Sequence, residues 1–425
     1  MSKTQRRGRE PYVRPVKKIE VSEKNIPLRI ALTVGFLAIG IGLLAYAVSS
    51  ALSVDPSWQV VEVNSSKVNC SQDLILNYDF SGTGTTATSL SKRLTGLYSK
   101  ATEDACVIFS ADIESDEIRN LRYLNQHVNE EVEVDPALYE ALALVQKYQN
   151  RCVYLAPVYI EYDRIFLYEN EEEAAIYDPG QNSELMPYIQ ELAAYANDPE
   201  MIDLELLGEN RVRLNVAQDY LDYVQANEIE GYLDFHWMTN AFITDYIAGI
   251  LVENGFTSGY LVSYDGFTRN LDQRELSYSF NLFDSRADGT YLPGRMDYTG
   301  PASIVFLRSF PMTQQDRWHY FPFSSGRIVT AQIDPTDGVS KSAIDNLVSY
   351  STTAGCAELL MQMLPVYLTD EFSAEGLGDL TEKGTYSVWC LDDVIHYNQE
   401  GLSLTVSEET HGVRYSKTYV SPDRG

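Results

Sequence analysis

The chain has 425 residues, of which 44% are hydrophobic and 22% are charged. This apolar content excludes a disordered protein, and the length suffices for one large core or two smaller ones. The formal net charge is −29 at pH 7, and a domain this acidic repels phosphate backbones, so we exclude nucleic acid as a partner.

The charge is distributed unevenly along the chain. Residues 1–29 form a basic tail with a net charge of +6, while the rest carries −35. No charged residue occurs in the 25 residues from Ile30 to Val54, a length that spans a bilayer as one helix. Because basic residues precede this segment, we predict a single-pass cell-membrane protein with residues 1–29 in the cytoplasm and the main domain extracytoplasmic. A cleaved secretory signal is the alternative.

We expect residues 55–69 to be a linker, although a first strand fits the same stretch, and residues 70–425 to be one domain. Alternating and short apolar runs predict strands at 73–80, 105–109, 153–159, 211–216, 259–263, 275–280, 302–306, 329–333, 386–391 and 402–406. Caps and helical periodicity predict helices at 87–98, 135–148, 183–193, 239–254 and 356–364. Strands and helices mix without strict alternation, which favours an α+β fold with mainly antiparallel sheet.

The five cysteines and five histidines give little sign of a metal or disulfide framework. Cysteines occur at positions 70, 106, 152, 356 and 390, an odd number without C-x-x-C spacing. We expect isolated buried thiols, with one or two bridges as the alternative. The histidines have no metal-ligand spacing, and the common phosphate-loop, dinucleotide and hydrolase motifs are missing.

Two segments, 233–266 and 331–364, carry a recognisable order of motifs. Asp234 and Asp245 match the ends of a D-L-G-x-x-A-K-G-Y-x-x-D segment, and Gly266 matches one glycine of a following G-G-D. Residues 333–338 (IDPTDG) match the core of H-I-I-D-P-x-T-G, and Ser349 matches the strand after it. In this order, over roughly residues 70–405, the chain resembles the ApbE family of FAD:protein FMN transferases.

This resemblance implies an ApbE-like, T-fold-related α+β domain that transfers FMN from FAD to a protein Thr with the help of magnesium. It also implies a cleft whose cofactor-binding residues are Asp234, His236, Asn240, Asp265, Gly266 and Asp334. The aromatic ring of His236 would stack on the flavin there, or else belong to a packed loop. A flavin-acceptor protein or an envelope redox protein is the implied partner.

The chain departs from the family at the positions that carry chemistry. Asn240-Ala241 replaces the family's Lys-Gly, Asp265 replaces the first glycine of G-G-D, and Phe267 replaces its Asp. Ala331 stands for the family's His, and residues 354–360 lack the Asp and Thr that hold magnesium. The resemblance therefore implies FAD and magnesium as possible cofactors, although the motifs that would bind them are degraded. No catalytic or metal-binding residue is assigned.

Three functions remain open on these grounds. The first is a divergent flavin transferase, with its activity either retained or lost. The second is a non-catalytic extracellular scaffold or binding module in a membrane redox or envelope complex. The third is an unrelated membrane-anchored sensor or adhesion domain.

Overall fold

The computed structural model describes residues 57–422, except 64–69, 82–86, 287 and 408. A compact unit begins at Trp58. Among the described residues, no helix has the length and apolar character needed to cross a membrane. The basic tail and the predicted membrane helix from Ile30 to Val54 lie outside the described residues.

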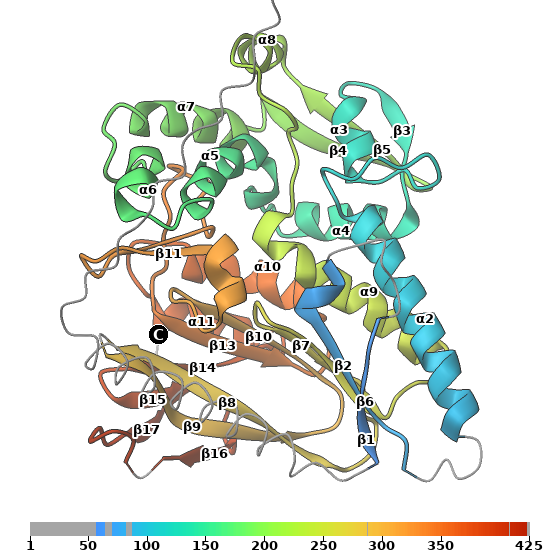
Figure 1. The fold of residues 1–425 in the computed structure, drawn as a ribbon, viewed down its shortest axis with the longest axis vertical. Helices are drawn as coiled ribbons and strands as arrows, with labels where there is room; N and C mark the ends of the chain where they lie inside the picture. Colours follow the sequence, from blue (N-terminus) through green and yellow to red (C-terminus); the bar gives the residue numbers. More distant parts are fainter. Residues whose placement is uncertain (1–56, 64–69, 82–86, 287, 408, 423–425) are drawn as a thin grey trace, which may run out of the picture. The chain divides into compact units, whose positions relative to one another are not determined.

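A nine-stranded sheet forms the centre of this unit (Figure 1). Its order is β1 (Trp58–Val61), β2 (Leu74–Asp79), β6 (Gly259–Ser263), β7 (Phe267–Asn270), β10 (Ala302–Arg308), β13 (Asn346–Ser351), β14 (Tyr386–Leu391), β15 (Val394–Tyr397) and β17 (Ser416–Tyr419). The neighbours pair antiparallel, apart from β15 with β17, which pair in parallel. The prediction of an α+β fold with mainly antiparallel sheet is confirmed.

Different layers cover the two faces of the sheet. The helices α2 (Ala87–Ile108), α9 (Thr239–Glu253) and α10 (Cys356–Tyr367) contribute to a core that includes Val305 of β10. On the other face, Ile304 packs in a second core with Leu282 and Met296 of a small sheet. That sheet contains β8 (Ser277–Arg286), β9 (Gly289–Thr299) and β16 (Ser403–Val406). Successive β10 residues thus serve opposite layers, as the two-residue period of a strand requires.

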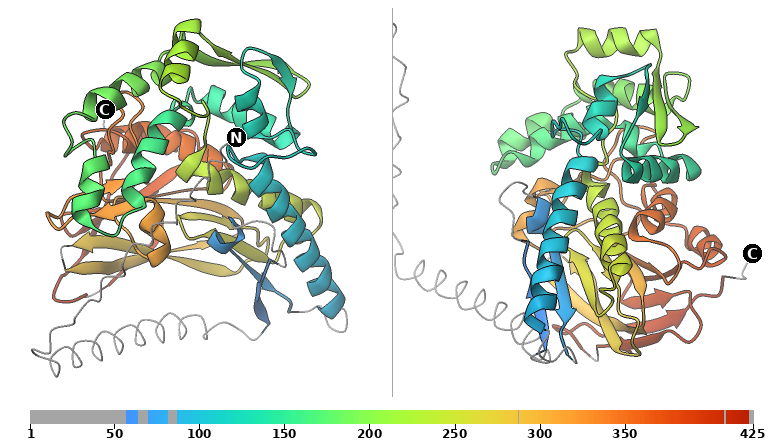
Figure 2. Two further views of the ribbon diagram at one scale, coloured as in Figure 1. Left: turned by 45° about the horizontal axis from the view of Figure 1, so that its top comes forward. Right: turned by 90° about the vertical axis from the view of Figure 1, so that its right-hand side faces the viewer.

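The remaining elements lie mostly beyond the helix-covered face (Figures 1 and 2). They include a three-stranded sheet of β3 (Glu131–Glu133), β5 (Arg211–Val216) and β4 (Ile202–Gly208). The helices of this group are α3 (Leu121–Gln126), α4 (Pro136–Lys147), η3 (Cys152–Tyr154), α5 (Ala156–Phe166), α6 (Glu171–Tyr177), α7 (Met186–Asn197), α8 (Gln218–Ala226) and η4 (His236–Met238). The shorter elements elsewhere are η1 (Cys70–Asp73), η5 (Gln314–Trp318), β11 (Tyr320–Pro322), β12 (Ile328–Thr330) and α11 (Ala374–Thr381).

Two predicted strands are helical, and both predictions were wrong for the same reason. Residues 105–108 belong to α2, which runs ten residues past its predicted end, and residues 153–159 lie in η3 and α5 apart from Leu155 between them. A short apolar run fits a buried strand and a buried helix equally well. Pro157 lies in the first turn of α5, where a helix needs no backbone N–H from it.

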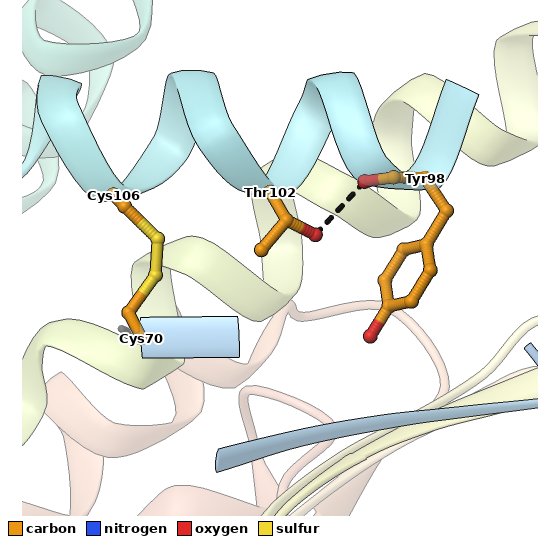
Figure 3. The surroundings of a disulfide bond; sticks show 4 residues. All are labelled: Cys70, Tyr98, Thr102 and Cys106. Carbon is orange, nitrogen blue, oxygen red and sulfur yellow. Dashed lines mark hydrogen bonds between the residues drawn. A yellow bond between two sulfur atoms is a disulfide. The ribbon is translucent and has the colours of Figure 1, made fainter. Parts of the chain in front are cut away.

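Two of the five cysteines form a disulfide. Cys70 of η1 is bonded to Cys106 of α2 (Figure 3), and this bond closes a loop with a sequence separation of 36. Cys152, Cys356 and Cys390 are free and buried. The expectation of isolated thiols was therefore correct for three cysteines and wrong for two.

Candidate functional site

The segments that carry the family resemblance converge between the central sheet and the helical group. The backbone N–H of Asp234 donates to the carbonyl of Val153 at 2.8 Å. The ring of His236 lies 5.8 Å from that of His319, and the His319 carbonyl accepts from the N–H of Ala331 at 2.9 Å. The structure thus brings residues 234–236 and 331–334 into one region.

His236 is held by contacts inside the protein. Its ring stacks on Tyr159 with centroids 4.3 Å apart and an interplanar angle of 6°, and its Nε2 lies 3.0 Å from Asp163. Burial lowers the pKa of His236, but the hydrogen bond and charge of Asp163 outweigh it, so the pKa is above its ordinary value. Asp234 accepts from the His236 backbone N–H at 2.8 Å. One ring face of His236 is therefore packed against Tyr159 and does not face a ligand.

A cavity of about 420 Å³ lies beside Asp234. Asp112, Asp163, Arg122 and Asn125 also line it. The Asn125 amide donates to a loop carbonyl at 2.8 Å and accepts a loop N–H at 2.9 Å, both in the segment just before Asp234. The volume falls within the range of small-molecule sites.

Sequence reasoning assigned no role to Asp163 or Arg122, although both line this cavity. Asp163 lies on α5. Because the first residues of α5 were predicted to form a strand, the sequence did not predict a helix that would carry Asp163 toward a site. Arg122 has a buried Nε without a hydrogen-bond partner among the described residues. Of the residues that line this cavity, the sequence predicted only Asp234 as a site residue.

Asp265 and Asn240, two predicted cofactor-binding residues, bind each other. The Asn240 Nδ2 donates to Asp265 Oδ2 at 2.8 Å, and the Ser263 hydroxyl donates to the other oxygen. The pKa of Asp265 is raised to about 7, mainly by burial and also by the charge of the nearby Asp73, while the hydrogen bond from Asn240 and the charge of Arg308 act in the opposite direction. A carboxyl group therefore occupies the position where the family has a glycine.

Gly266 allows a close approach of its loop to strand β10. Its φ is +112°, and a Cβ at this position would collide with the carbonyl oxygen of Phe306. The N–H of Phe306 donates to the Gly266 carbonyl at 2.9 Å. The close approach to β10 thus accounts for this glycine without a ligand.

The side chain of Asp334 accepts hydrogen bonds from residues of its own turn. It accepts from the backbone N–H and the hydroxyl of Thr336 at 2.9 and 2.7 Å. Its other oxygen accepts from Lys341 Nζ at 3.0 Å, and Lys341 also lies 2.7 Å from Asp337. Neither Asp265, Gly266 nor Asp334 lines the cavity beside Asp234.

The start of α10 holds the carboxylate of Asp245. Asp245 on α9 accepts from the backbone N–H groups of Cys356 and Ala357 at 2.9 and 2.8 Å. Arg269 of β7 lies 3.5 Å away. A Cβ on Gly355 would collide with the same carboxylate. Asp245 thus fills the positive end of this helix, where an anion is most stable.

These residues do not fit a magnesium site. The oxygens of Asp245 are committed to amides, and the first turn of α10 offers Glu358, which binds Lys147 and Tyr148. Within the described ranges, no three His, Cys, Asp or Glu side chains are grouped so as to hold a metal ion. Hard cations need several free oxygen ligands, and this region does not supply them.

Comparisons with known proteins identify the fold. No family model matches the sequence, and no curated protein matches it. The structure is similar to that of the ApbE protein from Thermotoga maritima, with a TM-score of 0.52 and 14% identity, over 79% of this chain and 93% of that one. Lower scores are found for the flavin transferase ApbE from Vibrio cholerae (0.45, 12% identity, 79% and 93%) and the Pseudomonas stutzeri flavinyl transferase ApbE (0.44, 12%, 79% and 91%).

The expected resemblance to ApbE proteins is confirmed at the level of the fold. At this identity, the likeness extends to the arrangement of helices and strands. What the site does has to be argued from the contacts of its own residues.

The role of Asp245 can be tested by removing its charge. Asp245→Asn should lower the free energy of unfolding by about 1–3 kcal/mol, because the amide replaces an acceptor at a helix N-terminus and leaves Arg269 without its counter-charge. Urea denaturation at pH 7 measures this loss. Asp379→Asn, at an exposed position of α11, is the matched control and should change stability by less than about 0.5 kcal/mol. Equal losses in the two variants would contradict the role.

The raised pKa of Asp265 predicts a pH-dependent stability. Its pKa is about 7 in the folded chain, against 3.8 for an ordinary aspartate side chain, so the folded state binds more protons between these two pH values. The free energy of unfolding should therefore fall as the pH rises from 4 to 7, by at most about 4 kcal/mol from this group. Asp265→Asn should flatten the decline in urea denaturation, whereas Asp379→Asn should leave it unchanged. A decline of the same size in Asp265→Asn would refute the assignment.

Proposed function

We propose that the chain is a non-catalytic binding module with the ApbE fold, held at the outer face of the membrane in an envelope or redox complex. The observation that carries this proposal is the carboxylate of Asp245, which binds the amides at the start of α10. FMN transfer requires positive groups that offset phosphate charge. Here Asn240 stands where the family has a lysine, and its amide binds Asp265, while Ala331 stands where the family has a histidine.

The charge pattern and the disulfide support anchoring and export. The uncharged segment from Ile30 to Val54 follows a tail of net charge +6, the arrangement of a helix with a cytoplasmic N-terminus. The bond between Cys70 and Cys106 belongs in an oxidising compartment. We therefore place residues from 55 onward outside the cell membrane.

Thiol counting in cells tests the exported location. Intact cells are lysed directly into denaturant with a maleimide polymer that adds mass to each free thiol. An exported domain should gain three labels before reduction and five after it, because the disulfide protects two cysteines. A chain carrying both Cys70→Ser and Cys106→Ser should gain three labels in both conditions. Five labels on the unreduced chain would contradict export, since a reducing cytoplasm keeps all thiols free.

Transfer of FMN from FAD to a protein Thr, with magnesium, is the second candidate. The cavity of about 420 Å³ beside Asp234 and Asn125 favours it, because this volume can enclose a ring system. Asp112, Asp163 and Asp234 make the cavity acidic, and Arg122 is its single Lys or Arg among the lining residues. A flavin ring without its phosphates suits these charges better than the whole of FAD.

Incubating the full chain in lipid nanodiscs with FAD and a Thr-containing acceptor protein, which takes up the FMN as AMP is released, separates the two candidates. We expect no release of AMP, with or without magnesium chloride, because the described residues include no metal site and Asn240 replaces the lysine of the family. Chromatography of the nucleotides measures the reaction, and flavin fluorescence measures binding in the same sample. Magnesium-dependent release of AMP would overturn the binding-module proposal and support the transferase. Flavin binding without AMP release would show that the chain binds FAD without transferring FMN, which supports the binding module.

A further inference from the structure

A second hollow lies on another part of the surface. A groove of about 530 Å³ runs between α4 and α9, which lie next to α2 in Figure 1. Its walls are largely apolar, with Leu144 of α4 and Tyr246 and Ile250 of α9 half-buried along it. Its lining shares no residue with the cavity beside Asp234.

The charged side chains that line this groove are all acidic. Asp135, Glu140 and Glu253 line it together with the capped Asp245, and no Lys or Arg is among the lining residues. Asp135 caps α4 by accepting from a backbone N–H at 2.8 Å. Glu140 and Glu253 are exposed, and neither forms an ion pair within the described part of the chain. The groove therefore presents uncompensated negative charge beside an apolar floor.

Basic side chains close to the groove do not neutralise it. Lys100 of α2 forms a salt bridge with Asp104. Besides burial, the charge of Asp104 contributes to raising the pKa of Tyr246 in the groove, so this ion pair lies close to the groove. Arg119, whose carbonyl accepts from the Asp135 N–H, lies 3.4 Å from Glu133. Each of these cations already has an acidic partner, so the excess charge of the groove remains.

Gly249 leaves the middle of the groove open. It lies within α9, is exposed, and a Cβ built on it would meet no atom within 4 Å. Glycine weakens a helix interior, and no contact within the described structure requires it here. A larger side chain would be accepted by the fold and would narrow the groove.

We propose that this groove binds a basic amphipathic helix of a partner protein. The apolar face of such a helix would lie on Leu144 and Ile250, and its Lys or Arg side chains would meet Glu140 and Glu253. A second copy of this chain is a poor occupant, because the part from residue 55 onward carries −35. An anionic lipid surface is repelled for the same reason.

This inference deepens the proposed binding function by naming the surface and the chemistry of the partner. It rests on that function but is tested separately. Release of AMP from FAD reports on transfer, whereas the groove is tested by peptide binding. Either proposal can fail while the other stands.

A displayed library of 18-residue amphipathic peptides, with Leu on one face and random polar residues on the other, provides the probe. The full chain in nanodiscs selects binders at low salt. We expect the recovered peptides to be rich in Lys and Arg. Their affinity, measured by fluorescence anisotropy, should fall at least tenfold in the Glu140→Lys, Glu253→Lys double variant, and also in Gly249→Leu.

The matched control is the double variant Glu172→Lys, Glu173→Lys, which makes the same charge change at exposed positions of α6. It should bind the selected peptides as the unmodified chain does, and circular dichroism should show all variants folded. Recovery of no binders, or of neutral or acidic binders, would overturn the proposal. Binding that survives in Gly249→Leu and in the Glu140→Lys, Glu253→Lys variant would also overturn it.

Discussion

The arrangement of helices on the sheet depends on one carboxylate, that of Asp245. It joins α9 to the first amides of α10 and lies 3.5 Å from Arg269 of β7. Arg269 in turn donates to the hydroxyl of Ser303 on β10 at 2.5 Å. Two helices and two strands are thus linked through a single charged group, because a helix N-terminus attracts an anion and a half-buried carboxylate requires donors. Because these contacts use the oxygens of Asp245 and the first amides of α10, few free hydrogen-bonding groups remain there for a ligand.

This pattern recurs in the neighbouring parts of the site. Asp334 is bound by its own turn and by Lys341, and Asp265 is bound by Asn240. Each predicted cofactor-binding carboxyl has found an internal donor, as a buried polar group must if it is not to destabilise the fold. The ApbE fold is therefore present here with Asp245, Asp265 and Asp334 each bonded to groups of the protein itself.

Local sequence signals predicted the elements that they control directly. Helix α4 starts at Asp135-Pro136, and β5 and β6 alternate, as expected. A helix cap and the two-residue period of a strand depend only on residues close together in the sequence. The same local signals gave wrong predictions for residues 105–109 and 153–159, where packing in the core decides between helix and strand. The order of motifs located Asp234 and Asp334. Their environment could not be predicted, since Asp163 reaches His236 across 73 positions of sequence and Asp245 reaches Cys356 across 111.

The disulfide of Cys70 and Cys106 has a mechanical consequence for the membrane anchoring proposed above. Tension applied through residue 57 would first peel β1, which is an edge strand held by four residue pairs. The load would then reach Cys70, where the covalent link to α2 passes it to a 22-residue helix instead of unzipping β2 from the sheet.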